Sequence, residues 1–278
     1  MSAPAQPLRH HTAHRYVQPL REGGSLPAVV DTDHGLYVVK FRGAGQGPRA
    51  LIAEIIVGLI AHALELPTPD LALIHVPPQF GRSEPDPEIQ DLLRASHGTN
   101  VGLRYLDGAF NFALAAARDV ITPDFANRLV WLDAFVTNPD RTHRNTNLLV
   151  WERQPWLIDH GAALYAHHDW NNVDDTRTRS PFPLIRNHVL ITEATELADI
   201  DDALAASLTE NRLRAVLDSV PDDLLVDTSV FPSPDAARQR YVHYLTERLR
   251  APRAFVTDAA LAREEALAAP AHRLADRR

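Results

Sequence analysis

Two groups of polar residues in this sequence have types and spacing that suit phosphoryl transfer. The first is the loop Asn138-Pro-Asp-Arg-Thr-His-Arg-Asn-Thr-Asn147, in which Asp140 and Asn145 stand five residues apart. The second is Asp159, which begins an Asp-His-Gly tripeptide fourteen residues after Asn145. Phosphoryl transfer needs a carboxylate near the attacking group and oxygen ligands that hold Mg²⁺ against the phosphates. Asp140 suits the first role, and Asn145 and Asp159 suit the second.

Turn chemistry is the other explanation of both pieces, because Asn, Asp, Pro and Gly all favour turns. Either piece alone would be interpreted as a turn. Here, however, a helical pattern precedes the loop, and the short apolar runs 148–151 and 156–158 predict a hairpin between the loop and Asp159. That hairpin would return Asp159 to the side of Asp140, and this arrangement favours a site.

Lys40 is the only lysine among the 28 basic residues of the chain, and the other 27 are arginines. An arginine-biased composition could have left one lysine by chance. A site that needs a compact ammonium, where a planar guanidinium would not fit, explains it equally well. Both explanations stay open at this point.

The elements around Lys40 are predicted to be a turn, a hairpin and a helix. A Gly-rich turn over 21–27, with Gly23, Gly24 and Ser25, precedes strands at 28–31 and 36–41, and the strands are joined by a Thr-Asp-His-Gly turn. Pro48 suits the first turn of a helix that Leu and Ile residues mark as far as Leu64.

Glu54 lies on the helix face that also carries Gly58, Ala61 and Glu65, away from the Leu and Ile stripe. A solvated polar face accounts for this position, and so does an ion pair with Lys40. Arg141, in the loop, could steady the backbone, contact phosphate or be solvated.

The remaining pattern predicts strands at 71–76 and 101–106, a surface loop at 77–88, and mostly helical structure beyond about residue 110. Thr122 is the expected N-cap of a helix that leads into the loop. Residues 1–20 are expected to be an irregular leader that ends in a strand near 16–20, so that its histidines, including His11, are solvated rather than metal-bound.

Composition excludes several classes of protein. The 278-residue chain has no cysteine, which rules out disulfides, cysteine zinc sites and thiol nucleophiles. Its formal net charge of −8 makes direct nucleic-acid binding a poor expectation. There is no apolar signal region and no membrane-length apolar run, so we expect a cytoplasmic protein with no membrane partner.

The sequence resembles the HipA-like branch of the protein-kinase-like superfamily. The matching segments are Tyr37-Val-Val-Lys-Phe41, Ala53-Glu54, the loop 138–147 and Leu157-Ile-Asp-His-Gly161. The resemblance implies an α+β, two-lobed kinase-like fold, with a small β-rich lobe over 1–110, a larger helical lobe over 111–278, and ATP bound between them.

The resemblance also implies roles for individual residues. Lys40 would contact the ATP phosphates, Glu54 would hold Lys40, and Asp140 would be the catalytic base. Asn145 and Asp159 would bind Mg²⁺. The turn residues Gly23, Gly24 and Ser25 would help to bind the nucleotide.

Two departures from ordinary protein kinases bear on the substrate. Asn138-Pro139 stands where those kinases have His-Arg before the catalytic Asp, and Asp159-His160-Gly161 replaces Asp-Phe-Gly. The phosphate acceptor is therefore open: a Ser or Thr of a protein, or a small molecule.

Alternatives to a kinase also remain. The same scaffold could transfer a nucleotidyl group, or it could be a pseudokinase or nucleotide-binding regulatory module. A toxin-type regulator that works with a DNA-binding partner would rest only on analogy with the protein that names the family.

Overall fold

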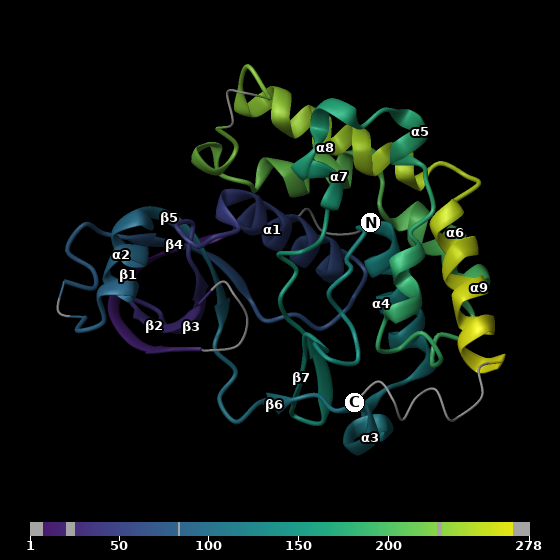
Figure 1. The fold of residues 1–278 in the computed structure, drawn as a ribbon, viewed down its shortest axis with the longest axis horizontal. Helices are drawn as coiled ribbons and strands as arrows, with labels where there is room; N and C mark the ends of the chain where they lie inside the picture. The colour runs from purple at the N-terminus through teal and green to yellow at the C-terminus, as the bar shows by residue number, and fades with distance from the viewer. Residues whose placement is uncertain (1–7, 21–25, 83, 227–229, 269–278) are drawn as a thin grey trace.

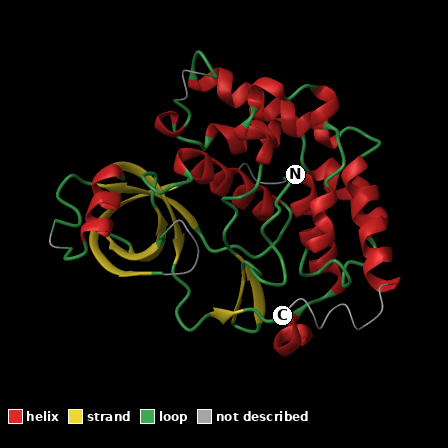
Figure 2. Cartoon of the chain, viewed as in Figure 1, coloured by secondary structure: helices red, strands yellow, loops and turns green. Residues whose placement is uncertain are grey.

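Strands gather in the N-terminal part of the chain and helices in the C-terminal part (Figures 1 and 2). The structure is a computed structural model that describes residues 8–20, 26–82, 84–226 and 230–268. Among these residues, five strands close into a barrel in the order β1-β2-β3-β5-β4. Their bounds are β1 (Arg9–Pro19), β2 (Ala28–Thr32), β3 (Gly35–Lys40), β4 (Leu71–Val76) and β5 (Gly98–Arg104).

The barrel contains the predicted hairpin and the strand that carries Lys40. β2 and β3 pair antiparallel from Ala28↔Val39 to Thr32↔Gly35, and Gly35 has a φ of 99°, a conformation that glycine adopts without strain. Small and branched apolar side chains from the strands fill a core of their own, which includes Val30, Val39 and Ile74. The strands predicted at 28–31, 36–41, 71–76 and 101–106 are confirmed, with shifts of a few residues at their ends.

The expected irregular leader is wrong for the described part of residues 1–20. β1 already begins at Arg9, and it pairs antiparallel with β2 and parallel with β4, for example His11↔Ile74. The side chain of His11 is buried, with an exposed fraction of 5%. The strand expected near 16–20 is confirmed as the end of β1, whereas its first half was not predicted, because only His11 and Ala13 of β1 are buried and they give no periodic apolar pattern.

Helix α1 (Gly47–Ala63) lies between the barrel and the C-terminal helices (Figure 1). Pro48 sits in its first turn, as predicted. The helix is buried on nearly all sides, since it contacts β5 on one side and α7 (Glu210–Asp218) and the 3₁₀ helix η5 (Asp222–Leu224) on another. A helix that is apolar all round is expected at such a position. The loop expected over 77–88 gives way to α2 (Pro87–Ala95), which Asp86 caps.

The C-terminal part is mainly helical. Its helices are α3 (Leu114–Ala117), α4 (Pro123–Phe135), α5 (Asp175–Thr178), α6 (Leu197–Ser207), α7, α8 (Pro234–Leu249) and α9 (Ala254–Ala268). A small sheet with the order β6-β7-β8 is made of β6 (Phe110–Asn111), β7 (Leu148–Trp151) and β8 (Gln154–Leu157), so the predicted hairpin before Asp159 is confirmed. A continuous apolar core joins α1 to α4, α8 and α9. No helix in the described ranges is both long and apolar enough to cross a membrane.

Both ends of α4 are satisfied by side chains. At its start, Thr122 Oγ1 accepts the amide of Phe125 at 3.1 Å, as the predicted N-cap should. At its end, Arg248 of α8 donates to the carbonyls of Phe135 and Ala134 at 2.7 and 3.0 Å, and to that of Thr178 at 2.7 Å. Helix ends leave carbonyls without intrahelical partners, so this buried arginine fixes the point where α4 stops and the 138–147 loop begins.

We predict that Arg248→Met lowers the free energy of unfolding by about 3 kcal/mol, because it leaves buried carbonyls unsatisfied while nearly keeping the volume. Urea unfolding measures this. The matched control is Arg94→Met near the end of α2, where the side chain is 65% exposed and its partner Asp91 is exposed as well, so the effect should stay within about 0.5 kcal/mol. Equal losses in the two variants would contradict the capping role.

Candidate active site

Lys40 meets two carboxylates that come from different elements. Its Nζ lies 2.7 Å from Glu54 Oε2 on α1 and 2.6 Å from Asp159 Oδ1, just after β8. Lys40 stands at the end of β3, paired with Val101 of β5, so the barrel fixes its position. The structure thus brings three of the predicted site residues, from distant parts of the sequence, into direct contact.

Glu54 is fully buried, and the idea that its helix face is solvated is wrong. Gly58 and Ala61 on the same face are buried as well, and only Glu65, beyond the end of α1, is exposed. Glu54 Oε2 accepts a second hydrogen bond, at 2.8 Å, from the backbone amide of His160. Glu54 therefore holds both Lys40 and the backbone that follows Asp159.

Lys40 and Asp159 stabilise each other's charge, whereas burial of Glu54 outweighs the effect of Lys40 and raises the pKa of that carboxyl. Burial acts to lower the pKa of Lys40, but the carboxylates of Glu54 and Asp159 outweigh it and raise that pKa. For Asp159, burial acts to raise the pKa, and Lys40 outweighs it, so the pKa is lowered. Asp159 keeps 38% of its side chain exposed, and its φ of 55° lies in the left-handed region. An ionised, partly open carboxylate is suited to receive a cation.

Asp140 and Asn145 form a second contact within the loop. Asp140 Oδ2 accepts from Asn145 Nδ2 at 2.8 Å and from Asn147 Nδ2 at 3.1 Å. Since its amide nitrogen is used in this way, the side-chain oxygen of Asn145 remains as the atom that could bind a metal ion. Asn147 also accepts, through its carbonyl, the amide of Ile158 at 3.1 Å, which joins the loop to the residue before Asp159.

Arg141 makes hydrogen bonds to residues next to both contacts, that of Lys40 with Asp159 and that of Asp140 with Asn145. Its guanidinium donates to the carbonyl of Asn147, and it lies 3.3 Å from His160 Nδ1 and 2.6 Å from Asp133 Oδ2. Arg141 is 1% exposed, which excludes the solvated and phosphate-binding interpretations of its side chain and leaves the role of steadying the loop.

Asp133 of α4 is the centre of this buried network. Besides Arg141, it accepts from Asn138 Nδ2 at 3.0 Å and from His188 Nε2 at 2.9 Å. Burial acts to raise the pKa of Asp133, but Arg141 and His188 outweigh it and hold the pKa well below its usual range. The segment around His188 and the loop are thereby fixed to the same helix, and Thr142 also bridges to His188.

A cavity of about 1300 Å³ opens beside the loop. Its lining includes Asn145 and Asn147 of the loop, Leu114, Arg118 and Asn187. Its volume exceeds that of ordinary small-molecule pockets. Lys40 is not among its lining residues. A smaller cavity of about 290 Å³ is lined by residues that include Gln46, Arg49 and Trp170, and by none of Lys40, Asp140, Asn145 and Asp159.

Comparison with known proteins identifies the family. A family model described as HipA-like kinase matches residues 17–234, a stretch that includes Lys40, Glu54, the loop 138–147 and Asp159. The chain belongs to the HipA-like kinase family. The resemblance found in the sequence is thereby confirmed, and family membership supports a kinase-type phosphotransferase.

Among solved structures, this HipA-like kinase is similar to the Helicobacter pylori proinflammatory kinase CtkA. The TM-score is 0.55 and the sequence identity 12%, with 95% of this chain and 100% of that chain covered. At this identity the likeness shows the fold alone. No curated protein matches the chain.

Sequence reasoning missed two residues of the buried network, Asp133 and His188. Asp133 had a signal: it is a carboxylate inside the apolar run Leu-Asp-Ala-Phe of a helix that must be buried. His188 had none, because only the tertiary fold brings it to α4. The predicted nucleotide-binding turn Gly23-Gly24-Ser25 lies outside the described residues.

Two buried histidines are expected to make the stability of this protein depend on pH. Burial lowers the pKa of His160 and of His167 to about 3, and the charge of Arg141 adds to the effect at His160. In the unfolded chain these side chains bind protons near the ordinary histidine pKa of 6.5, which the folded chain cannot do. This stabilisation is complete above that pKa and is lost as the pH falls through the window toward about 3.

We predict that the free energy of unfolding falls by on the order of 2 kcal/mol per such histidine between about pH 7.5 and about pH 5. Urea unfolding at several pH values measures the slope. His167→Leu should make the slope shallower, whereas His75→Gln, on the exposed side of β4, should leave it unchanged. A pH-independent stability over this range would contradict the prediction.

Proposed function

We propose that this chain is an ATP- and Mg²⁺-dependent phosphotransferase that transfers the γ-phosphoryl group of ATP to a hydroxyl, such as a Ser or Thr of a protein or a small molecule. The observation that carries the proposal is the contact of Lys40 Nζ with both Glu54 and Asp159. Such a contact places a cation and a candidate metal ligand side by side where phosphates would bind.

The carboxylate of Asp159 and the side-chain oxygen of Asn145 are of the kind that fits Mg²⁺, which prefers carboxylate and amide oxygens. Asp159 is ionised and partly exposed, and the side-chain oxygen of Asn145 is left over from its contact with Asp140. Asp159 and Asn145 would hold the ion, which would offset the charge of the phosphates. Lys40 would contact a phosphate in place of Asp159, while Glu54 would keep the ammonium in position.

Asp140 acts on the acceptor in this proposal. Its carboxylate takes the proton of the acceptor hydroxyl as the new bond from that oxygen to the γ-phosphorus forms and the bond to the β–γ bridging oxygen breaks, which releases ADP. Asn145 and Asn147 hold the carboxylate by its Oδ2 and so aim its other oxygen. Positioning and charge stabilisation supply most of the rate, since the protein needs no covalent step.

We place the boundary between a small lobe, 1–110, and a larger lobe, 111–278, near β6, with ATP between the lobes. The barrel core is separate from the larger core, which supports a boundary in this region. α1 belongs by sequence to the small lobe but packs into the larger core. Movement of the lobes relative to each other would therefore change the contacts that α1 makes with α7 and with η5.

Label transfer from ATP tests the proposal. We predict that ATP labelled on the γ-phosphate passes its label to a protein or small-molecule fraction of a cell lysate when Mg²⁺ is present. Transfer of an α-phosphate label instead would indicate nucleotidyl transfer. Nucleotide binding without transfer of either label would identify a pseudokinase or a regulatory module and would sink the proposal.

Lys40→Arg is the matched variant for that assay, because it keeps the charge. Lys40 is 8% exposed, and its ammonium lies between two carboxylates. Because the wider guanidinium does not fit there, phosphoryl transfer should fall by about a hundredfold. Arg15→Lys, an exposed exchange on β1, controls for the loss or gain of a lysine. Transfer by Lys40→Arg within about twofold of wild type would favour the chance explanation of the single lysine.

Asp140→Asn and Asp159→Asn should fail in different ways. Loss of the base in Asp140→Asn should lower the transfer rate by about a hundredfold or more with nucleotide affinity nearly kept. Loss of a metal ligand in Asp159→Asn should weaken Mg²⁺-dependent ATP binding as well as the rate. Calorimetry with and without Mg²⁺ and rate measurements separate the two.

Thermal unfolding without ligand is the control for both variants, because each carboxylate also makes structural hydrogen bonds. If both variants bind ATP and transfer phosphate like wild type, the catalytic assignment is wrong. If both lose binding equally, the division of roles between Asp140 and Asp159 is wrong although the site itself is retained.

A further inference from the structure

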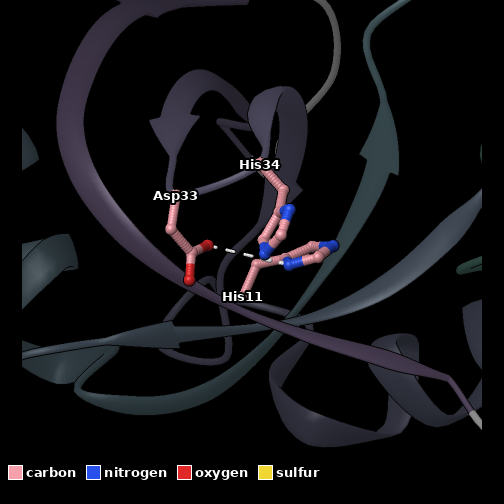
Figure 3. A group of neighbouring side chains, drawn as sticks. All are labelled: His11, Asp33 and His34. Carbon is pink, nitrogen blue, oxygen red and sulfur yellow. Dashed lines mark ion pairs between the residues drawn. The ribbon is translucent and has the colours of Figure 1, made fainter.

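Three side chains with metal-ligating atoms meet at the end of the barrel where β2 turns into β3. They are His11 of β1, and Asp33 and His34 of the turn itself (Figure 3). One ligand atom from each lies within 4.8 Å of the others. The group is far along β3 from Lys40, which occupies the opposite end of the strand.

His11 is the unusual member of the group. It is 5% exposed, and neither of its ring nitrogens has a hydrogen-bond partner among the described residues. The nearest Asp33 oxygen is 3.7 Å from its Nδ1, too far for a hydrogen bond. A buried imidazole with two unsatisfied nitrogens is costly, and such a group in a native fold calls for a ligand or ion that satisfies it.

The other two members are already held in place. Asp33 Oδ1 accepts the amide of Thr12 at 3.0 Å, and the amide of Asp33 reaches the Thr12 carbonyl at 3.3 Å. Thr32 Oγ1 accepts the amide of His34 at 3.1 Å and donates to the Gly35 carbonyl at 2.8 Å. The rings of His11 and His34 lie side by side, with centroids 4.5 Å apart, and the Asp33 carboxylate points toward them (Figure 3).

We propose that His11, Asp33 and His34 form a site for one divalent transition-metal ion, with Zn²⁺ as the best match, that clips β1 to the β2–β3 turn. Two imidazoles and one carboxylate are a ligand set for Zn²⁺ rather than for Mg²⁺ or Ca²⁺, which prefer oxygen alone. Bonds of about 2.0–2.2 Å require the ligand atoms to close in slightly. The exposed His34 side chain can make that movement, and a fourth position stays open to water.

The position gives the site a structural purpose that is independent of phosphoryl transfer. β1 pairs with β2 as far as Ala13↔Thr32 and with β4 from Arg9 to Thr12. The proposed ion lies where the pairing of β1 changes from β4 to β2. It would therefore stabilise β1 against the β2–β3 turn at the point where the barrel closes.

Metal titration of the full chain, without an affinity tag and after chelator treatment, tests the proposal. The primary variant is His34→Gln, since this residue is exposed and its replacement should not disturb folding. The control is His10→Gln, the exposed neighbour of His11 on the opposite face of β1. Calorimetry with Zn²⁺ should show one site per chain in wild type and in His10→Gln. The affinity for Zn²⁺ should be at least about tenfold weaker in His34→Gln and in Asp33→Asn. Even the loss of a residue that only hydrogen-bonds to a metal ligand weakens metal binding by that much.

Two further readouts separate this site from the oxygen ligands near Lys40. Co²⁺ in place of Zn²⁺ should give the visible absorption of nitrogen-ligated, four-coordinate cobalt in wild type and lose it in His34→Gln, and excess Mg²⁺ should not change it. Zn²⁺ should raise the unfolding temperature of wild type and His10→Gln but not of His34→Gln. Equal Zn²⁺ affinity in wild type and His34→Gln, or no binding to wild type, would overturn the proposal.

Discussion

The contact of one ammonium with two carboxylates organises this molecule. Lys40 ends a barrel strand, Glu54 lies inside a buried helix, and Asp159 follows a hairpin of the helical part, yet their charged atoms meet within hydrogen-bond distance. A buried charge is tolerated only when it is paired and hydrogen-bonded. Each of the three segments must therefore keep its position for the other two to be stable, and this requirement joins the barrel, α1 and the β7–β8 hairpin.

A second cluster of buried charged groups holds the loop 138–147 in place. Asp133 gathers Arg141, Asn138 and His188 around one carboxylate, and Arg141 extends from it to Asn147 and His160. Polar networks of this kind are stable when every member is satisfied and costly when one is removed. Buried side chains that do not touch the exposed side chains of the loop therefore hold the loop that carries Asp140. A catalytic group that must be positioned needs support of this kind.

The sequence was informative where spacing is local and uninformative where contacts are distant. The hairpin before Asp159, the Thr122 cap and the strand of Lys40 follow from turn chemistry and periodicity over a few residues. Glu54 was ambiguous, because an α-helical face with one carboxylate suggests a solvated surface until the packing on it is known. The first half of β1 and His188 were not predicted, since the partners that hold them, β4 and α4, lie far away in the chain. The family resemblance supplied the roles that spacing alone could not give to Lys40 and Glu54.

The parallel pairing of β1 with β4 has a consequence for the order in which this protein acquires its shape during synthesis. Residues 9–12 of β1 emerge first, but their partners at 72–75 follow only after the whole of α1 has been made. At about 5–20 residues per second, the gap amounts to several seconds. The β1–β2–β3 sheet can form within that time, with the edges of β1 and β3 both exposed. Barrel closure consequently has to wait for β4 and β5, and α1, which contacts the barrel at β5, can take up that contact only when the last strand has been made.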